Sequence, residues 1–196
     1  TGSAQSINNG IDLAGEGGLL WIKRRNSTNP GLFFDTERGG TKYIIPSDSA
    51  TEGSSDANTG FNNNGFTLNN TWQGLNNSAG EYASWSFRKA KGCFTCLTYT
   101  GNGSNRQISH DLGCVPGSIW IKCTSQAQDW VVYHRGSNAS PEDYVLRLNS
   151  NIAAASAAAF NNTLPTSTNF SLGTAGSING NGETYICYLF AGGKGT

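Results

Sequence analysis

Cysteines and histidines are the residues of this chain best suited to metal, redox or nucleophilic chemistry. Cys93 and Cys96 have the CxxC spacing of many zinc and redox sites. The surrounding segment, GCFTCLTYT, has the composition of a β-strand, in which residues three apart point to opposite faces. A zinc site would also need a second ligand pair, and the sequence offers only 2 histidines. We therefore expect reduced thiols and no metal site, with an isolated disulfide between Cys114 and Cys123 across a hairpin as the alternative.

The two histidines lack the surroundings of a catalytic site. His110 lies beside Asp111 in ISHDL, and His134 lies beside Arg135 in VYHRG. A catalytic histidine needs a nucleophile and a carboxylate placed around it, but the sequence has no GxSxG motif or other nucleophile signature. Acidic residues are too scattered to form the carboxylate pair of a glycosidase. We therefore expect no catalytic residues and no cofactor. Loop oxygens in residues 47–60 suit calcium, although no EF-hand spacing supports such a site.

Three residues are candidates for ligand binding. Arg38 and Arg135 occupy matching positions in two similar segments, TERG and YHRG. An arginine at a turn can hold backbone carbonyls or a carboxylate with its planar guanidinium, so we interpret both as structural and keep ligand binding as the alternative. Trp72 lies in the Asn-rich segment LNNTWQGLNN and is the tryptophan best placed for an exposed contact. The other four tryptophans lie in apolar or strand-like runs and are predicted to be core: Trp21, Trp85, Trp120 and Trp130.

The two halves of the sequence resemble each other. Five segments recur in the same order, and the offset between the copies stays between 97 and 104 residues. This pattern predicts two homologous modules, residues 1–92 and 93–196. The matched segments are GGLLWIK with PGSIWIK, TERG with YHRG, TKYII with EDYVL, NGFTL with TNFSL, and GEYASWSFRKAKG with GETYICYLFAGGKG.

Short runs rich in β-branched and aromatic residues are separated by Asn-Gly turn signals. This alternation predicts an all-β fold of two tandem antiparallel β-sandwich modules of the jelly-roll or lectin-like type. Residues 49–61 are predicted to be a loop, and residues 152–160 a loop with one helical turn. The expected strands in the first module, followed by the strand that opens the second, are residues 19–23, 31–35, 41–45, 65–68, 82–87 and 93–100.

The first module has no counterpart of the strand that opens the second module. The second has CFTCLTYT before its Thr-Gly dipeptide, whereas the first begins at Thr-Gly. We expect that the chain was cut from a longer array, or that residues 93–99 form a shared or donated strand. An unpaired sheet edge left by the missing strand would be a natural place for another chain to add.

Charge and hydropathy exclude two classes of partner. The chain has 13 basic and 13 acidic residues, so no basic field is available for nucleic acid or an anionic membrane surface. No stretch approaches the roughly 18 apolar residues of a membrane helix. We expect neither nucleic acid nor a membrane as a partner.

The motifs GLLWIKRRN, GLFFDTERGGTKYI, NGFTLNN and GEYASWSFRKAKG resemble, in this order, a repeat domain of unknown function in virion structural and tail-fibre-like proteins of tailed phages. Marine phages and cyanophages are the usual sources. CFTCLTYTGNGSNRQISHDLGCVPGSIWIKCTS, DWVVYHRG and YVLRLN resemble the second half of the same family, so the resemblance covers nearly the whole chain. The chain departs from the family pattern at CFTC, Cys114 and Cys123. The resemblance implies a structural or adhesin-like role and carries over no catalytic residues.

These observations together predict a non-enzymatic structural module of a bacteriophage virion, such as a tail fibre, an appendage or a capsid decoration. Its partners would be other copies of itself or other virion proteins, bound through sheet edges and exposed aromatic patches. The alternative is a lectin-like adhesin that binds host surface glycan through Asn-, Ser- and Trp-rich loops. A polysaccharide hydrolase is the least favoured function.

Overall fold

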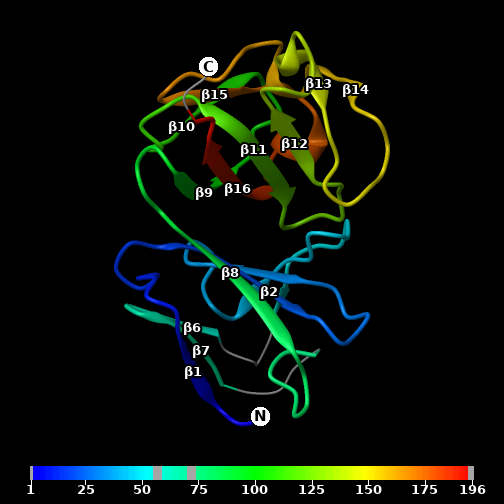
Figure 1. Cartoon of the computed structure of the whole chain (residues 1–196). Coiled ribbons are helices and arrows are strands. Elements are labelled where there is room, and N and C mark those ends of the chain that lie inside the picture. Colours follow the sequence, from blue (N-terminus) through cyan, green and yellow to red (C-terminus); the bar gives the residue numbers. More distant parts are fainter. Residues whose placement is uncertain (1, 55–58, 70–73, 194–196) are drawn as a thin grey trace. The chain divides into compact units, whose positions relative to one another are not determined.

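A computed structural model of the chain describes residues 2–54, 59–69 and 74–193 (Figure 1). The prediction of an all-β fold is confirmed, because antiparallel sheets make up most of the regular structure. The chain divides into two compact units. Unit 1 comprises Thr1–Ser47 and Glu52–Lys89, and unit 2 comprises Asp48–Thr51 and Ala90–Thr196.

Unit 1 contains two three-stranded antiparallel sheets and a short two-stranded ladder. Strand β2 is the centre of one sheet, in the order β3-β2-β8, and β7 is the centre of the other, in the order β1-β7-β6. The strands of unit 1 are β1 (Gln5–Asn8), β2 (Gly18–Arg24), β3 (Leu32–Asp35), β4 (Lys42–Tyr43), β5 (Gly53–Ser54), β6 (Thr59–Asn62), β7 (Gly65–Leu68) and β8 (Tyr82–Arg88).

Unit 2 contains a four-stranded antiparallel sheet in the order β12-β11-β16-β9, and β10 pairs with β15 in a second sheet. Its strands are β9 (Phe94–Thr100), β10 (Arg106–Ser109), β11 (Pro116–Cys123), β12 (Val131–His134), β13 (Tyr144–Val145), β14 (Ala155–Ser156), β15 (Asn169–Leu172) and β16 (Thr184–Ala191). Its helical segments are single turns: η1 (Pro141–Asp143), η2 (Ala158–Phe160) and α1 (Gly176–Asn179).

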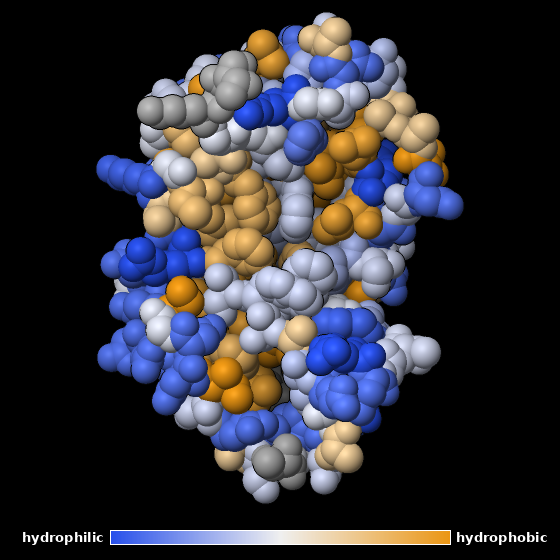
Figure 2. Space-filling view, in the orientation of Figure 1, coloured by the Kyte–Doolittle hydropathy of each residue, from blue (hydrophilic) through white to orange (hydrophobic). Residues whose placement is uncertain are grey.

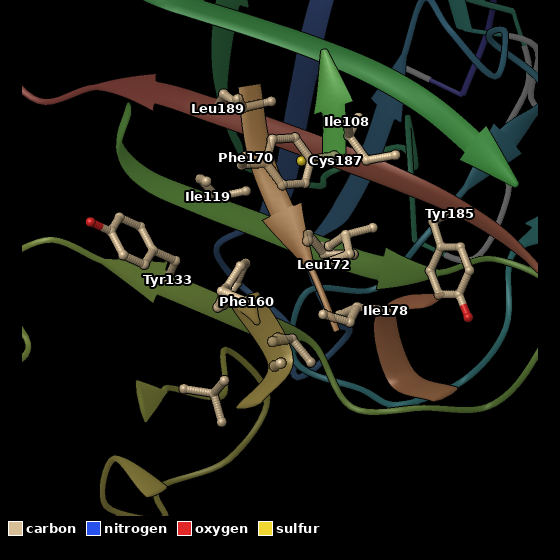
Figure 3. Packing of buried hydrophobic residues seen from close by; sticks show 14 of the residues in the cluster. Ile108, Ile119, Tyr133, Phe160, Phe170, Leu172, Ile178, Tyr185, Cys187 and Leu189 are labelled. Atoms are coloured by element: carbon tan, nitrogen blue, oxygen red, sulfur yellow. The ribbon is translucent and has the colours of Figure 1, made fainter. Parts of the chain in front are cut away.

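Each unit has its own hydrophobic core. The core is built from every second residue along the strands, because successive side chains point to opposite faces of a sheet. In unit 2 the core takes side chains from both sheets, among them Ile119 of β11, Cys187 of β16 and Phe170 of β15 (Figure 3). In unit 1, the core likewise takes side chains from both larger sheets, such as Leu20 of β2 and Phe66 of β7. The sheets of each unit therefore enclose a common apolar interior, as in a sandwich.

Two buried asparagines hold the loops of the two units. The side-chain nitrogen of Asn76 donates to the Ser3 carbonyl oxygen at 2.7 Å, and that of Asn179 donates to the Ser104 carbonyl oxygen at 2.8 Å. Both side chains lie in residues that are 0% exposed. Buried polar groups of this kind are stable only when hydrogen-bonded, so each asparagine replaces the water that its loop backbone would otherwise need.

Most of the predicted strands are present, with shifts of a residue or two at their ends. The segment 41–45 forms only the short β4, followed by a bridge between Ile44 and Phe33. The prediction of a loop over residues 49–61 is wrong, because β5 and the start of β6 lie there. Both strands are too short to show a clear alternation of apolar residues. The single helical turn expected in residues 152–160 is present as η2, but the rest of that segment is not all loop, because β14 lies there.

Candidate functional site

Of the three candidate ligand-binding residues, Trp72 lies outside the described residues. Arg38 lies inside unit 1, with its side chain 4% exposed. Its Nε donates to Asp35 Oδ2 at 2.7 Å, and its terminal nitrogens reach Glu52 Oε2 at 3.1 Å and the Phe33 carbonyl oxygen at 3.3 Å. Asp35 is itself fully buried. The guanidinium therefore neutralises the buried carboxylate of Asp35 and stabilises the turn after β3. This is the structural role expected for Arg38.

Arg135 has different surroundings. It is exposed, and its guanidinium donates to the Gly193 carbonyl oxygen at 3.4 Å. It lines an open pocket of about 320 Å³ together with Cys114 and Val115. Among the described residues, this surface has one cationic side chain and otherwise backbone and apolar groups, and these do not form a constellation for a specific ligand.

The sequence match between Arg38 and Arg135 is wrong in structural terms. The Arg135 backbone N–H donates to Gly117 O, and in unit 1 the N–H that donates to Gly18 O belongs to Thr36. Because Trp21 and Trp120 hold the same place in β2 and β11, Arg135 corresponds to Thr36. The short segments TERG and YHRG matched two residues out of register, since the turn after β12 differs in length from the turn after β3.

Both histidines accept hydrogen bonds from backbone N–H groups two residues further along the chain. Nδ1 of His134 accepts a hydrogen bond from the Gly136 N–H at 3.2 Å, and Nδ1 of His110 accepts one from Leu112 at 3.4 Å. Burial lowers the pKa of His110. Within the described ranges, no group of three or more His, Cys, Asp or Glu side chains could hold a metal ion.

All five cysteines are free thiols. Cys96 is buried in β9, whereas Cys93 is exposed in the turn that precedes this strand, so the expectation that both lie on opposite faces of one strand is wrong. Cys123 is buried and Cys114 is half-buried, and the two are not joined. The three buried thiols, Cys96, Cys123 and Cys187, therefore pack as small apolar groups, and the alternative of a Cys114–Cys123 disulfide is wrong.

The feature of the molecule best suited to binding is the outer edge of β8. This strand pairs with β2 on one side, where Ser84 lies opposite Ile22 and Trp85 opposite Trp21. No strand in the described part of the chain pairs with its other side. Ser84 and Trp85 are exposed, and 44% of the Trp85 surface is accessible to solvent. Figure 2 shows the residues along β8 at the surface of the drawn face, mostly in pale colours of intermediate hydropathy.

The corresponding edge in unit 2 is covered. Strand β16 pairs with β11 on one side, with Tyr188 opposite Trp120, and with β9 on the other, with Tyr188 opposite Cys96. Tyr188 and Cys187 are both 0% exposed. The same position in the sheet is therefore an outer edge in unit 1 and an interior strand in unit 2.

A pocket lies on the core side of the β8 edge. It has a volume of about 130 Å³ and opens beside the exposed Ser84. Its walls are mainly apolar and come from both larger sheets of unit 1. They include Ile7, Ile22, Phe66, Leu68, Tyr82 and Ser84.

The family model with the description "Domain of unknown function (DUF7483)" matches residues 1–196. The chain belongs to this family. Comparison with curated proteins and with solved structures gives no significant match.

The exposure of the tryptophans in this DUF7483 chain agrees only in part with the prediction from the sequence. Trp130 is fully buried, as predicted, and Trp21 and Trp120 are half-buried, but the prediction that Trp85 lies in the core is wrong. The signal that could have revealed the edge is the composition of β8. YASWSF carries Ser84 and Ser86 where YICYLF of β16 carries Cys187 and Leu189.

The described part of the DUF7483 chain contains no helix with the length and apolar character needed to cross a bilayer. Its one α-helix, α1, has four residues.

Proposed function

We propose that this chain is a non-enzymatic structural module of a bacteriophage virion, such as a tail fibre, an appendage or a capsid decoration. It acts by assembling with other copies of itself or with other virion proteins in the extracellular particle. The observation that carries the proposal is the outer edge of β8, which pairs with no strand among the described residues and has the exposed Trp85 at its centre. The resemblance of the sequence motifs to phage virion repeats supports the same role.

We further propose that the chain is a tandem of two copies of one β-sandwich module of the jelly-roll or lectin-like type. The hydroxyl of Tyr82 donates to the Gly74 carbonyl oxygen, and that of Tyr185 donates to Gly176 O at 2.6 Å. Each hydroxyl also accepts a backbone N–H of its own loop, from Asn77 and Gly180 respectively. Repetition of such a specific local network supports common descent of the two units.

An open sheet edge is a surface for protein association because it presents unpaired backbone donors and acceptors. Natural β-proteins usually protect such edges with charges or proline. Strand β8 carries one charged residue, Arg88, at its end, and the segment Ala83–Ser86 is uncharged. An outer strand with so little charge does not oppose the addition of another strand, and this supports a role in assembly.

Light scattering after size exclusion, with electron microscopy of the same peak, tests this function. Concentration-dependent oligomers or fibres are expected from the full chain. The variant Trp85→Lys should shift the distribution to monomer, because a charge at the centre of the edge opposes strand addition. Ile152→Lys is the matched control, since Ile152 is 65% exposed but lies on a loop of unit 2. A compact monomer at every concentration would rule out self-assembly.

A lectin-like adhesin is the second candidate, and exposed Trp85 favours it as well. Its ring lies 4.6 Å from that of Trp21, and flat aromatic faces of this kind stack on sugar rings. Binding to a panel of bacterial surface polysaccharides, lost in Trp85→Ala or Trp72→Ala, would support this function. The absence of binding to any member of the panel would count against it.

A further inference from the structure

We infer that the outer edge of β8 and the pocket beneath it form an acceptor site for a β-strand of the β9 type, supplied by another copy of the module. This inference rests on the proposed assembly function and names the segment that the edge receives. Strand β9 of this chain is already paired with β16. The incoming strand therefore has to come from a copy in which the equivalent strand is free.

The pairing in unit 2 defines how the incoming strand would lie. In that unit β9 runs antiparallel to β16, with Cys96 opposite Tyr188, Leu97 opposite Cys187 and Tyr99 opposite Tyr185. The pairings of β8 with β2 and of β16 with β11 place Trp85, Ser84 and Tyr82 at these three positions in unit 1. An incoming strand would therefore set its Cys96 equivalent beside Trp85 and its Leu97 equivalent beside Ser84.

The pocket beneath the edge is the space that β9 side chains fill in unit 2. There, Leu97 and Tyr99 pack against the core. The core residues that correspond to the pocket walls of unit 1 are Ile108, Ile121, Phe170, Leu172, Tyr185 and Cys187. Five of these six side chains are drawn in Figure 3 with labels, all except Ile121. In unit 1 the same walls surround about 130 Å³ of unfilled space.

The aromatic contacts in unit 2 show what the incoming strand would gain. The rings of Tyr99 and Tyr185 are stacked with centroids 5.0 Å apart, and the Tyr99 hydroxyl donates to Ile178 O at 2.7 Å. Tyr82 of unit 1 lines the pocket and offers its ring at the position of Tyr185. Backbone pairing would supply affinity, and alternate side chains entering the pocket would supply specificity.

A synthetic peptide with the sequence of residues 92–101, carrying serine in place of both cysteines, tests the inference on the full chain. Backbone hydrogen exchange should slow on the order of tenfold in residues 82–88 when the peptide is bound. Tryptophan emission should shift to shorter wavelength as Trp85 becomes covered. The same peptide should dissociate oligomers that use this edge, because both compete for β8.

Two matched changes localise the binding. A peptide with aspartate in place of the leucine equivalent to Leu97 should not bind, because a charge would enter the apolar pocket. The protein variant Ser84→Arg should also lose binding, since its side chain blocks the pocket mouth, and it should remain folded because Ser84 is exposed. Peptide that binds Ser84→Arg as well as it binds the unaltered chain would overturn the inference.

A second variant covers the case in which a short peptide binds too weakly. Residues 93–101 are copied in front of Thr1, so that the strand leads into β1 as β9 leads into β10. Tethering raises the local concentration of the strand to the millimolar range. Protection of residues 82–88 in this variant supports the inference. No protection by either peptide or fused strand overturns it, and oligomers that persist in that case leave the proposed assembly function intact.

Discussion

Trp85 and Tyr188 hold the same position in their sheets, but 44% of the surface of Trp85 is exposed and none of that of Tyr188. Each lies directly opposite a tryptophan of the neighbouring strand, Trp21 in one case and Trp120 in the other. The ring of Tyr188 is further stacked with Trp130 at 6.3 Å and with Phe94 of β9 at 6.4 Å. Unit 1 has no strand in the place of β9 within the described residues.

This relationship predicts unequal effects of truncating the two side chains. Tyr188→Ala should lower the free energy of unfolding by about 3–5 kcal/mol, because it leaves a cavity among buried aromatic rings. Trp85→Ala should lower it by less than about 1 kcal/mol, because part of its ring surface is already solvated. Guanidinium unfolding followed by circular dichroism measures both values. Equal losses would mean that Trp85 is buried in solution, and the edge of β8 would then not be open.

Arg38 and Arg135 form a second contrasting pair. Removing the Arg38 guanidinium leaves Asp35 as a buried carboxylate without its cation, so Arg38→Ala should cost about 3–5 kcal/mol in unfolding free energy. Arg135→Ala is the matched control and should leave the midpoint of unfolding unchanged, because Arg135 is exposed.

A double variant separates the charge from the packing at this site. Replacing Arg38 by Met and Asp35 by Leu removes both charges and should recover much of the stability lost in Arg38→Ala. If Arg38→Ala and Arg135→Ala had equally small effects, the buried ion pair would not be part of the fold in solution.

Asn179 is predicted to be indispensable for the loops around α1. Its side-chain nitrogen donates to Ser104 O and Gly173 O at 2.8 and 2.7 Å, and its Oδ1 accepts the Asn102 N–H at 3.1 Å. Asn179→Ala leaves the buried Gly173 O and the two part-buried backbone groups without this partner and should cost about 1–3 kcal/mol. Thermal unfolding measures the loss against the exposed control Asn151→Ala. Equal unfolding temperatures for the two variants would contradict this role.

The strands could be predicted from the sequence because their signal is local. Runs such as LLWIK and CFTCLTYT combine β-branched and aromatic residues, which pack well on a pleated surface. The pairing of strands is not local, and the burial of a side chain depends on that pairing. Trp85 was therefore predicted as core from its own strand, whereas its exposure depends on which strand lies beside β8.

The same limit applies to the residues that hold the loops. Asn76 and Asn179 gave no signal in the sequence, because their partners Ser3 and Ser104 are 73 and 75 residues away. Arg38 and Arg135 were paired from two short motifs, but hydrogen bonds between strands place Arg135 beside Gly117. A match of a few residues cannot fix register where the connecting turn has changed length.

Alkaline pH is predicted to destabilise unit 2 through groups that are buried in neutral form. Burial raises the pKa of Tyr185 from 10.0 to about 12, and it raises the pKa values of Tyr99 and Cys187 well above their usual range. The folded state therefore holds these protons more tightly than the unfolded state. The contribution of Tyr185 to stability is complete below pH 10 and is lost as the pH rises from 10 towards 12, whereas that of Cys187 begins to fall above pH 9.0, the ordinary pKa of its thiol.

Unfolding temperatures measured across this pH range, with tyrosinate absorbance recorded in parallel, test the effect. We expect the unfolding temperature to fall steadily above pH 10, with the tyrosinate of Tyr185 appearing only near pH 12 or as the protein unfolds. Tyr185→Phe should be less stable at neutral pH, because Gly176 O and the Gly180 N–H lose their partner, but its stability should depend less on alkaline pH. Tyr99 and Cys187 would account for the dependence that remains. If all tyrosines titrated near pH 10 while the protein stayed folded, the packing of Tyr99 against Tyr185 would not be that of a closed core.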